Sequence, residues 1–394
     1  MERWCVLTGM VWAVTAGSLY SDDRIDSAVE CRRTGAAIVE GAVGGKSRSA
    51  MIIDTGSPTC LVDRKWAEQE LVGFATFQHK VKTISSTSMR TFFKDVPVSL
   101  SGKPVFPVEC CAVDLSLVSS VVNRDVVVVG MPYLQNCVLE FSDSGGCQIL
   151  SELPKLDADA VVVPMRIQRL RPEIEVALPV LGKQWVVLDT GNTGSMTLTA
   201  QRIGSLKRMG HLVDGKDVWA VDAQGELVKS NSYVLRRIRI AGIEFRNVQV
   251  DESHVDTIGL QLLHRFHMVL DFPAERIYLW HEGKKKVDSI APNASGGAVG
   301  LKRKGHIQVF KIRENSPASE LGLTPTDEIT MIDGKKPASL GHWELQEILS
   351  QAGKTIPLTV LREGKELHME MTLRHSIPFP PDWPPEKPEF NPEP

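Results

Sequence analysis

The chain has 394 residues, enough for two or three domains that each bury a core of their own. Its composition is that of an ordinary globular protein, 42% hydrophobic and 24% charged, and a net charge of -3 provides no basic surface for nucleic acid. Beyond the N-terminus no apolar run approaches the roughly 18 residues of a membrane-spanning helix, so we expect no integral span in the mature chain.

The N-terminal segment has the features of a secretory signal. Arg3 precedes an apolar stretch from Trp4 to about Ala16, and small residues follow directly. This order is typical of a signal peptide, which we place at 1–18, and it predicts a secreted or periplasmic protein. Two alternatives stay open, a first strand or helix of the domain and an uncleaved segment that anchors the protein to a membrane.

Six cysteines remain after that segment, and their spacing fits no zinc site with partner histidines. They are Cys31, Cys60, Cys110, Cys111, Cys137 and Cys147. Cys137 and Cys147 flank a turn-rich "SDSGG" between two apolar runs, which predicts a disulfide across a hairpin in an oxidising compartment. The competing interpretation is a set of reduced, buried thiols.

Two segments of the chain repeat each other. "AMIIDTGSPTCLV" (50–62) and "WVVLDTGNTGSMTL" (185–198) each run from an apolar strand into Asp-Thr-Gly. An apolar run ending in glycine follows each motif, "VVVVG" 76 residues after the first Asp and "DTIG" 70 residues after the second. Short β-branched runs separated by turn residues predict the same all-β unit twice, over 30–150 and 160–282. Helical patterns are limited to stretches around 64–70, 200–208 and 260–266.

The C-terminal part of the chain has a different organisation. A charged and then small-residue-rich stretch at 283–297 is a plausible linker. Residues 298–374 read as strand, short helix, strand, longer helix and a final hairpin, a small α+β domain. The last segment, 375–394, holds eight prolines and is expected to be an extended, solvated tail.

Packing of the two halves about a pseudo-twofold axis would explain why each half carries an acid at the end of an apolar strand. A lone carboxylate is costly to bury, but Asp54 and Asp189 would meet and retain one proton between them. Such a pair holds an acid and a base at once, and can hydrolyse an amide through a bound water. This chemistry needs no metal, cofactor or covalent nucleophile.

The residues beside each acid suit the same task. Thr55 and Thr190 supply hydroxyls that can brace the two loops against each other. Gly56 and Gly191 let backbone amides approach the carboxylates where a side chain would intrude.

At these residues the sequence resembles the two lobes of an aspartic protease of the pepsin and retropepsin superfamily. The resemblance implies two pseudo-symmetric retropepsin-like β-barrel lobes, with Asp54 and Asp189 as the catalytic pair. It also assigns loop-support positions to Ser57 and Asn192, although Asn192 is not the usual choice. The family's flap tyrosine has no clear counterpart at 83–100, where the sequence contains no Tyr. A better candidate flap is the hairpin pattern at 218–235, and which lobe supplies the flap stays open.

The segment "ENSPASELGLTPTDEITMIDGKKP" resembles a PDZ domain of the bacterial kind, with Thr326 where a Gly is common. The resemblance implies that a peptide C-terminus adds as a strand beside "HIQVFKI" (306–312). Its carboxylate would meet the backbone amides of Ala298, Val299, Gly300 and Leu301. The alternative is a PDZ fold that only packs against the protease lobes.

Together these patterns predict a mainly β protein, an aspartic endopeptidase whose C-terminal PDZ domain recruits or positions protein substrates or partners. The rival prediction is a catalytically inactive protease fold that serves as a PDZ-bearing scaffold, and a third is an enzyme that mainly cleaves its own chain. His254, His264 and His267 cluster in the second half, but their spacing fits no metal motif.

Overall fold

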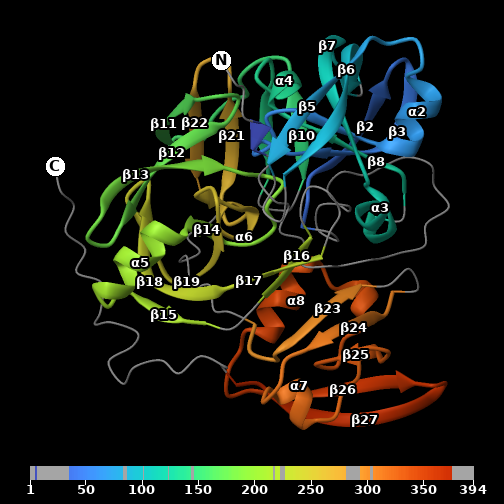
Figure 1. Cartoon of the computed structure of the whole chain (residues 1–394). Helices are drawn as coiled ribbons and strands as arrows, with labels where there is room; N and C mark the ends of the chain where they lie inside the picture. Colours follow the sequence, from blue (N-terminus) through green and yellow to red (C-terminus); the bar gives the residue numbers. More distant parts are fainter. Residues whose placement is uncertain are drawn as a thin grey trace.

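The computed structural model describes residues 5–6, 35–82, 87–100, 102–122, 124–142, 146–215, 218–221, 227–280, 293–301 and 305–374. Most of the predicted signal peptide, Cys31, most of the linker and the proline-rich tail lie outside the described residues. The described chain is mainly β, with two barrel-like lobes and a small C-terminal domain (Figure 1). None of the helices formed by the described residues is long and apolar enough to cross a membrane.

The first lobe is built on an eight-stranded sheet. Its elements are β1 (Cys5–Val6), β2 (Ile38–Val43), β3 (Lys46–Ile53), β4 (Cys60–Asp63), α2 (Arg64–Glu70), β5 (Thr76–Lys82), β6 (Thr87–Leu100), β7 (Phe106–Val113), α3 (Ser116–Val122), β8 (Val126–Val129) and α4 (Met131–Leu134). The strand order β6-β2-β3-β8-β4-β7 closes on itself through a β6–β7 pairing. β8 reads Val-Val-Val-Val and is wholly buried, as expected of a strand in the middle of a core.

The second lobe repeats this arrangement. Its elements are β11 (Val161–Ile167), β12 (Pro172–Leu178), β13 (Gly182–Leu188), β14 (Met196–Thr199), α5 (Ala200–Arg208), β15 (Leu212–Asp214), β16 (Val218–Val221), β17 (Leu227–Ser230), β18 (Ser232–Ile240), β19 (Ile243–Ser253), β20 (Thr257–Ile258), α6 (Leu260–Leu263), β21 (His267–Asp271) and β22 (Arg276–Trp280). The order β18-β12-β13-β20-β14-β19 closes through a β18–β19 pairing, the same circuit as in the first lobe. The predicted repeat of two pseudo-symmetric barrels is therefore confirmed.

The two lobes share a sheet. The first-lobe hairpin of β9 (Val138–Phe141) and β10 (Cys147–Leu150) extends the second-lobe sheet, because β9 pairs antiparallel with β21 and places Leu139 opposite Leu270. A single hydrophobic core runs through both lobes, from Met51 and Val129 in the first to Leu188 and Phe266 in the second.

The register of that hairpin contradicts the predicted disulfide. Cys147 pairs with Phe141, whereas Cys137 lies four residues further along the strand, about 13 Å away at 3.3 Å per residue. A disulfide needs Cα atoms within about 7 Å. Both thiols are buried and neither forms a disulfide, so the alternative of reduced, buried cysteines describes this pair.

The observed helices agree with the predicted ones where the helical sequence pattern is several residues long. α2 and α5 have the predicted bounds, while α6 ends at Leu263, three residues short of the predicted end. α3 and α4 were not predicted. α3 reads "SLVSSVV", which also suits a strand, and α4 is a single turn directly after Gly130.

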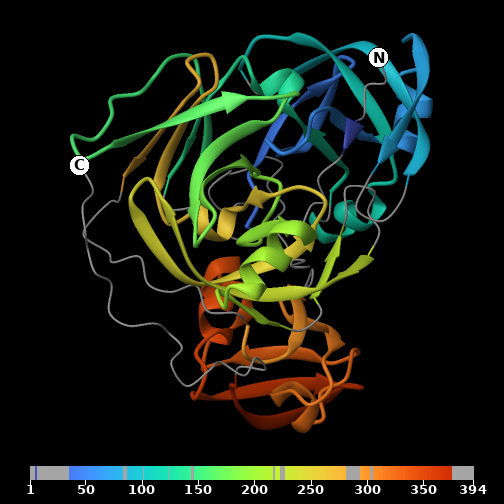
Figure 2. The ribbon, with the colours of Figure 1, turned by 60° about the vertical axis from the view of Figure 1, so that its left-hand side comes forward.

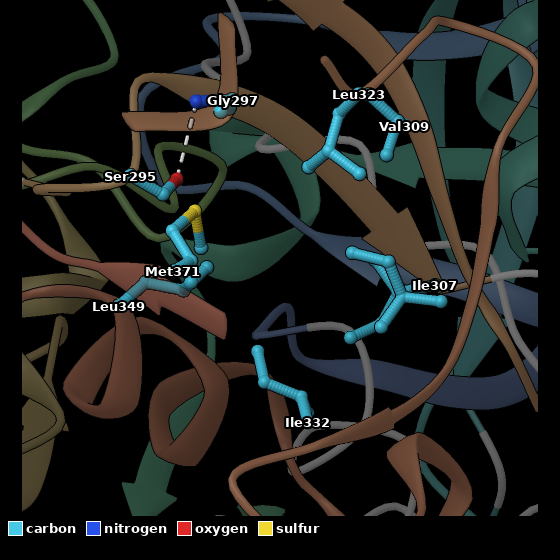
Figure 3. A pocket seen from close by; sticks show the side chains of 10 residues that line it. Ser295, Gly297, Ile307, Val309, Leu323, Ile332, Leu349 and Met371 are labelled. Atoms are coloured by element: carbon cyan, nitrogen blue, oxygen red, sulfur yellow. Dashed lines mark hydrogen bonds between the residues drawn. The ribbon is translucent and has the colours of Figure 1, made fainter. Parts of the chain in front are cut away.

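The C-terminal domain has one five-stranded sheet in the order β23-β24-β25-β26-β27. Its elements are β23 (Gly297–Leu301), β24 (Ile307–Ile312), α7 (Pro317–Glu320), β25 (Glu328–Ile332), η1 (Pro337–Ser339), α8 (His342–Leu349), β26 (Thr355–Arg362) and β27 (Lys365–Thr372). A small apolar cavity lies in its core between Ile307, Ile332, Leu349 and Met371 (Figure 3). It accommodates about 10 Å³, one water-sized sphere, so it is a packing defect rather than a ligand site.

The C-terminal domain packs against both lobes through α8, which faces them in Figures 1 and 2. The imidazole of His342, 1% exposed, lies against Gly35 of the first lobe, where an added Cβ would come within 2.7 Å of the ring. Trp343 stacks on His264, the C-cap of α6 in the second lobe, with ring centroids 4.2 Å apart. The domain therefore bridges the two lobes.

Candidate functional site

Asp54 and Asp189 stand at equivalent ends of two central strands. β3 runs parallel to β8, and the Asp54 N–H donates to the Val129 carbonyl at 3.0 Å. β13 runs parallel to β20, and the Asp189 N–H donates to Ile258 at the same distance. Each acid therefore leaves its barrel at the same point, directly after a buried apolar strand.

The two carboxyl groups receive matched hydrogen bonds from their own loops. Asp54 Oδ1 accepts from the backbone N–H groups of Gly56 at 2.9 Å and Ser57 at 3.1 Å. Asp189 Oδ1 accepts from Gly191 and Asn192, each at 3.0 Å. Both side chains are only 2% exposed.

The structure brings these carboxyls together across the lobe interface. A Cβ added to Gly56 would lie 2.4 Å from Asp189 Cγ, and one added to Gly191 would lie 2.5 Å from Asp54 Cγ. Each carboxyl thus rests on the glycine of the opposite loop, and the two are hydrogen-bonded to each other. Glycine is required at both positions, because any side chain would displace the opposing acid.

Thr55 and Thr190 connect the loops through a reciprocal set of hydrogen bonds. The Thr55 hydroxyl donates to the Leu188 carbonyl at 2.6 Å, and the Thr190 hydroxyl donates to Ile53 at 2.8 Å. Each hydroxyl also accepts the backbone N–H of the other threonine, at 3.0 and 3.1 Å. Four buried bonds therefore fix one acid-bearing loop on the other.

We expect Thr190→Val to lower the free energy of unfolding by about 2–4 kcal/mol, since it leaves a buried carbonyl and a buried N–H without partners. Thr190→Ser keeps the hydroxyl and is the matched control, with an expected loss below about 1 kcal/mol. Urea unfolding of the three proteins measures the difference. A larger loss in Thr190→Ser than in Thr190→Val would show that the methyl group, not the hydroxyl, stabilises this contact.

Burial determines the electrostatics of the pair. Desolvation raises the pKa of Asp54, against the hydrogen bonds from Asp189 and the loop N–H groups. Desolvation also raises the pKa of Asp189, and the neighbouring Asp54 charge raises it further. Two carboxyls this close cannot both ionise cheaply, so one proton stays between them at neutral pH.

Ser57 and Asn192 support the loops through their backbones, while their side chains point to other partners. The Ser57 hydroxyl donates to the Thr59 carbonyl at 2.6 Å. The Asn192 side chain donates to the Thr257 hydroxyl at 3.0 Å and accepts the Gly194 N–H at 2.8 Å. The unusual asparagine therefore has a structural role that is compatible with an intact acid pair.

Hairpins project from corresponding places in both lobes. β5 and β6 form one in the first lobe, and β16 pairs with β17 in the second, within the predicted 218–235. β16 and β17 form a two-stranded sheet of their own, whereas β5 and β6 belong to the eight-stranded sheet of the first lobe. The residues at both tips, 83–86 and 222–226, lie outside the described residues.

Arg171 belongs to the site, although no sequence pattern marked it. It lies between β11 and β12, and its Nε donates to the Gly56 carbonyl at 3.3 Å. In the sequence, Arg171 is marked only by its position directly before β12. That position becomes informative when the strands of the two barrels are aligned. Among the described residues, no group of three or more acidic, His or Cys side chains could hold a metal ion.

The residues predicted to bind a peptide carboxylate, Ala298, Val299, Gly300 and Leu301, all belong to β23. β24 is flanked by β23 on one side and β25 on the other. The expectation that a peptide adds beside 306–312 is therefore wrong, because both edges of that strand are occupied. The edge strand on this side of the sheet is β23, which carries the four predicted residues themselves.

Comparison with known proteins identifies the C-terminal domain. A family model described as PDZ domain matches residues 289–373, so the domain begins nine residues before the predicted 298. No curated protein matches the chain. Among solved structures, one similar chain is the crystal structure of an aminopeptidase N family protein from Idiomarina loihiensis, with 17% identity over 22% of this chain and 14% of that chain. Its TM-score of 0.16 supports no conclusion about fold or function.

Proposed function

We propose that this protein is an aspartic endopeptidase in which Asp54 and Asp189 activate a water for attack on a peptide bond. The observation that carries the proposal is the meeting of two nearly buried carboxyls from equivalent loops of two equivalent barrels. The four threonine hydrogen bonds hold the pair rigid, and rigidity of this kind preorganises acid and base for the reaction.

The chemistry follows from one proton shared by two acids. The ionised carboxylate removes a proton from water while the protonated carboxyl donates its own to the amide oxygen, which forms a neutral tetrahedral diol. Return of a proton to the amide nitrogen lets the carbon–nitrogen bond break, and the pair regains its starting state. All of the protons are moved by these two side chains.

The PDZ domain indicates a peptide or protein partner. We propose that a partner's C-terminus adds as a strand to β23, since this strand forms one edge of the five-stranded sheet. The carboxylate would meet the backbone of 298–301, and a substrate held there would be kept near the lobes that α8 contacts.

Digestion of an unfolded protein mixture by the full chain between pH 3 and 8 tests the proposal, with the new termini read by mass spectrometry. We expect cleavage by the wild type that EDTA does not change, and none by an Asp54→Asn/Asp189→Asn double variant. Absence of new termini at every pH would favour the inactive scaffold. Inhibition by EDTA would point to a metal-dependent enzyme.

A further inference from the structure

The two acid-bearing loops bind their acids through matched hydrogen bonds, which makes a difference in charge beside them informative. Backbone register aligns the lobes, because Ile38 pairs with Ile52, two residues before Asp54, and Glu173 pairs with Val187, two residues before Asp189. The residue two positions before Ile38 is Ala36, and the residue two positions before Glu173 is Arg171. A methyl group in one lobe thus corresponds to a guanidinium in the other.

Arg171 reaches from the second lobe onto the catalytic loop of the first. Its Nε donates to the Gly56 carbonyl at 3.3 Å. Gly56 is the residue whose N–H binds Asp54 and whose Cα lies against the Asp189 carboxyl. The cation is therefore bound to the Gly56–Ser57 peptide, whose N–H donates to Asp54.

We propose that Arg171 is a positioning residue that breaks the twofold symmetry of the acid pair, keeping Asp54 as the ionised base and leaving the shared proton on Asp189. The inference rests on the proposed function and specifies the direction of its proton transfers. Water would give its proton to Asp54 as its oxygen bonds to the carbonyl carbon, and Asp189 would give its proton to the carbonyl oxygen. On collapse, Asp54 protonates the leaving nitrogen as the carbon–nitrogen bond breaks, and a diol proton returns to Asp189.

The charges facing the pair favour this direction. Asp54 is faced by Asp189 and by Arg171, whose positive charge lowers the pKa of Asp54 against the larger effect of burial. Asp189 is faced by the Asp54 carboxylate, which raises the pKa of Asp189 beyond the effect of burial. Since the loop N–H bonds are matched, the guanidinium is a charge that acts on Asp54 without a counterpart among the groups that act on Asp189.

Carboxyl 13C NMR of the full chain tests the assignment without relying on activity. With Asp54→Asn and Asp189→Asn used to assign the two signals, we expect the wild type to ionise first at Asp54. In Arg171→Gln this first ionisation should move up by about one pH unit, and in Arg171→Lys, which keeps the charge, by much less. Arg239→Gln, which removes an exposed charge from β18, is the matched control and should leave the first ionisation unchanged.

The outcomes separate this inference from the proposed function. First ionisation at Asp189 in the wild type would overturn the inference even if Arg171→Gln failed to fold. Equal shifts in Arg171→Gln and Arg171→Lys, or no shift in either, would also overturn it. If peptidase activity is present, the pH at which kcat/KM falls on the acid side should move up in Arg171→Gln by the same amount as the first ionisation measured by NMR. Absence of activity would count against the proposed function, while the NMR result would still decide the role of Arg171.

Discussion

Asp54→Asn and Asp189→Asn should each lower kcat/KM for peptide hydrolysis by about 10³-fold or more, because one carboxyl cannot hold both the acid and the base. The double variant should be little worse than either single variant, since the two residues act as a unit. Initial rates on a short peptide measure the loss. The fold should persist, because an amide has the shape of the carboxyl and carries no charge to bury.

The chain offers a matched control for that experiment. Asp251 is 7% exposed, and burial raises its pKa to about 6, yet it lies on β19 and belongs to neither acid-bearing loop. Asp251→Asn therefore removes a buried carboxyl from the same lobe and should leave the rate within a few-fold of the wild type. Substantial hydrolysis by either Asp54→Asn or Asp189→Asn would remove the acid pair from the mechanism.

Acidification should loosen the contact between the PDZ domain and the lobes. Burial lowers the pKa of His264 to about 3, with a further contribution from Arg265, and burial lowers that of His342 to about 4. Both values lie below the unfolded value near 6.5, so folded and unfolded states differ in bound protons only below that pH. Stability is therefore complete above pH 6.5 and falls as pH drops toward 4, by up to about 3 kcal/mol for each histidine.

Unfolding of the full chain at a series of pH values between 7.5 and 4 measures this loss. His342→Asn should lose less stability than the wild type over this interval, because it removes one of the two titrating groups. His368→Asn is the control, since His368 is exposed on β27 and should not alter the slope. An unchanged slope in His342→Asn would mean that this ring is protonated without cost where it lies against Gly35.

The sequence predicted the site best where a pattern occurs twice. Asp54 and Asp189 begin identical triplets directly after apolar strands, and the packing of the two equivalent lobes brings those strand ends together. Arg171 could not be found in this way, because its importance comes from the difference between the lobes, and a search for repeats discards differences. Its contact with Gly56 spans 115 residues and depends on how the lobes dock.

Register was the other limit of prediction. Cys137 and Cys147 flank a turn, but the sequence does not state which residues pair across it, and the actual pairing separates them. The same is true of the PDZ domain, where strand composition located β24 but not β23, the strand that forms the edge of the sheet. Side chains such as Trp343 resemble ordinary helix residues until the domain is seen against α6.

The pairing of β9 with β21 has a consequence for how the protein responds to dilution. In an enzyme assembled from two separate subunits, the acids part when the protein concentration falls below the dissociation constant. Here both acids are on one chain, and a first-lobe strand is hydrogen-bonded into the second-lobe sheet. The two halves meet at the effective concentration set by that connection, so specific activity should not change with enzyme concentration, down to the lowest that an assay can detect.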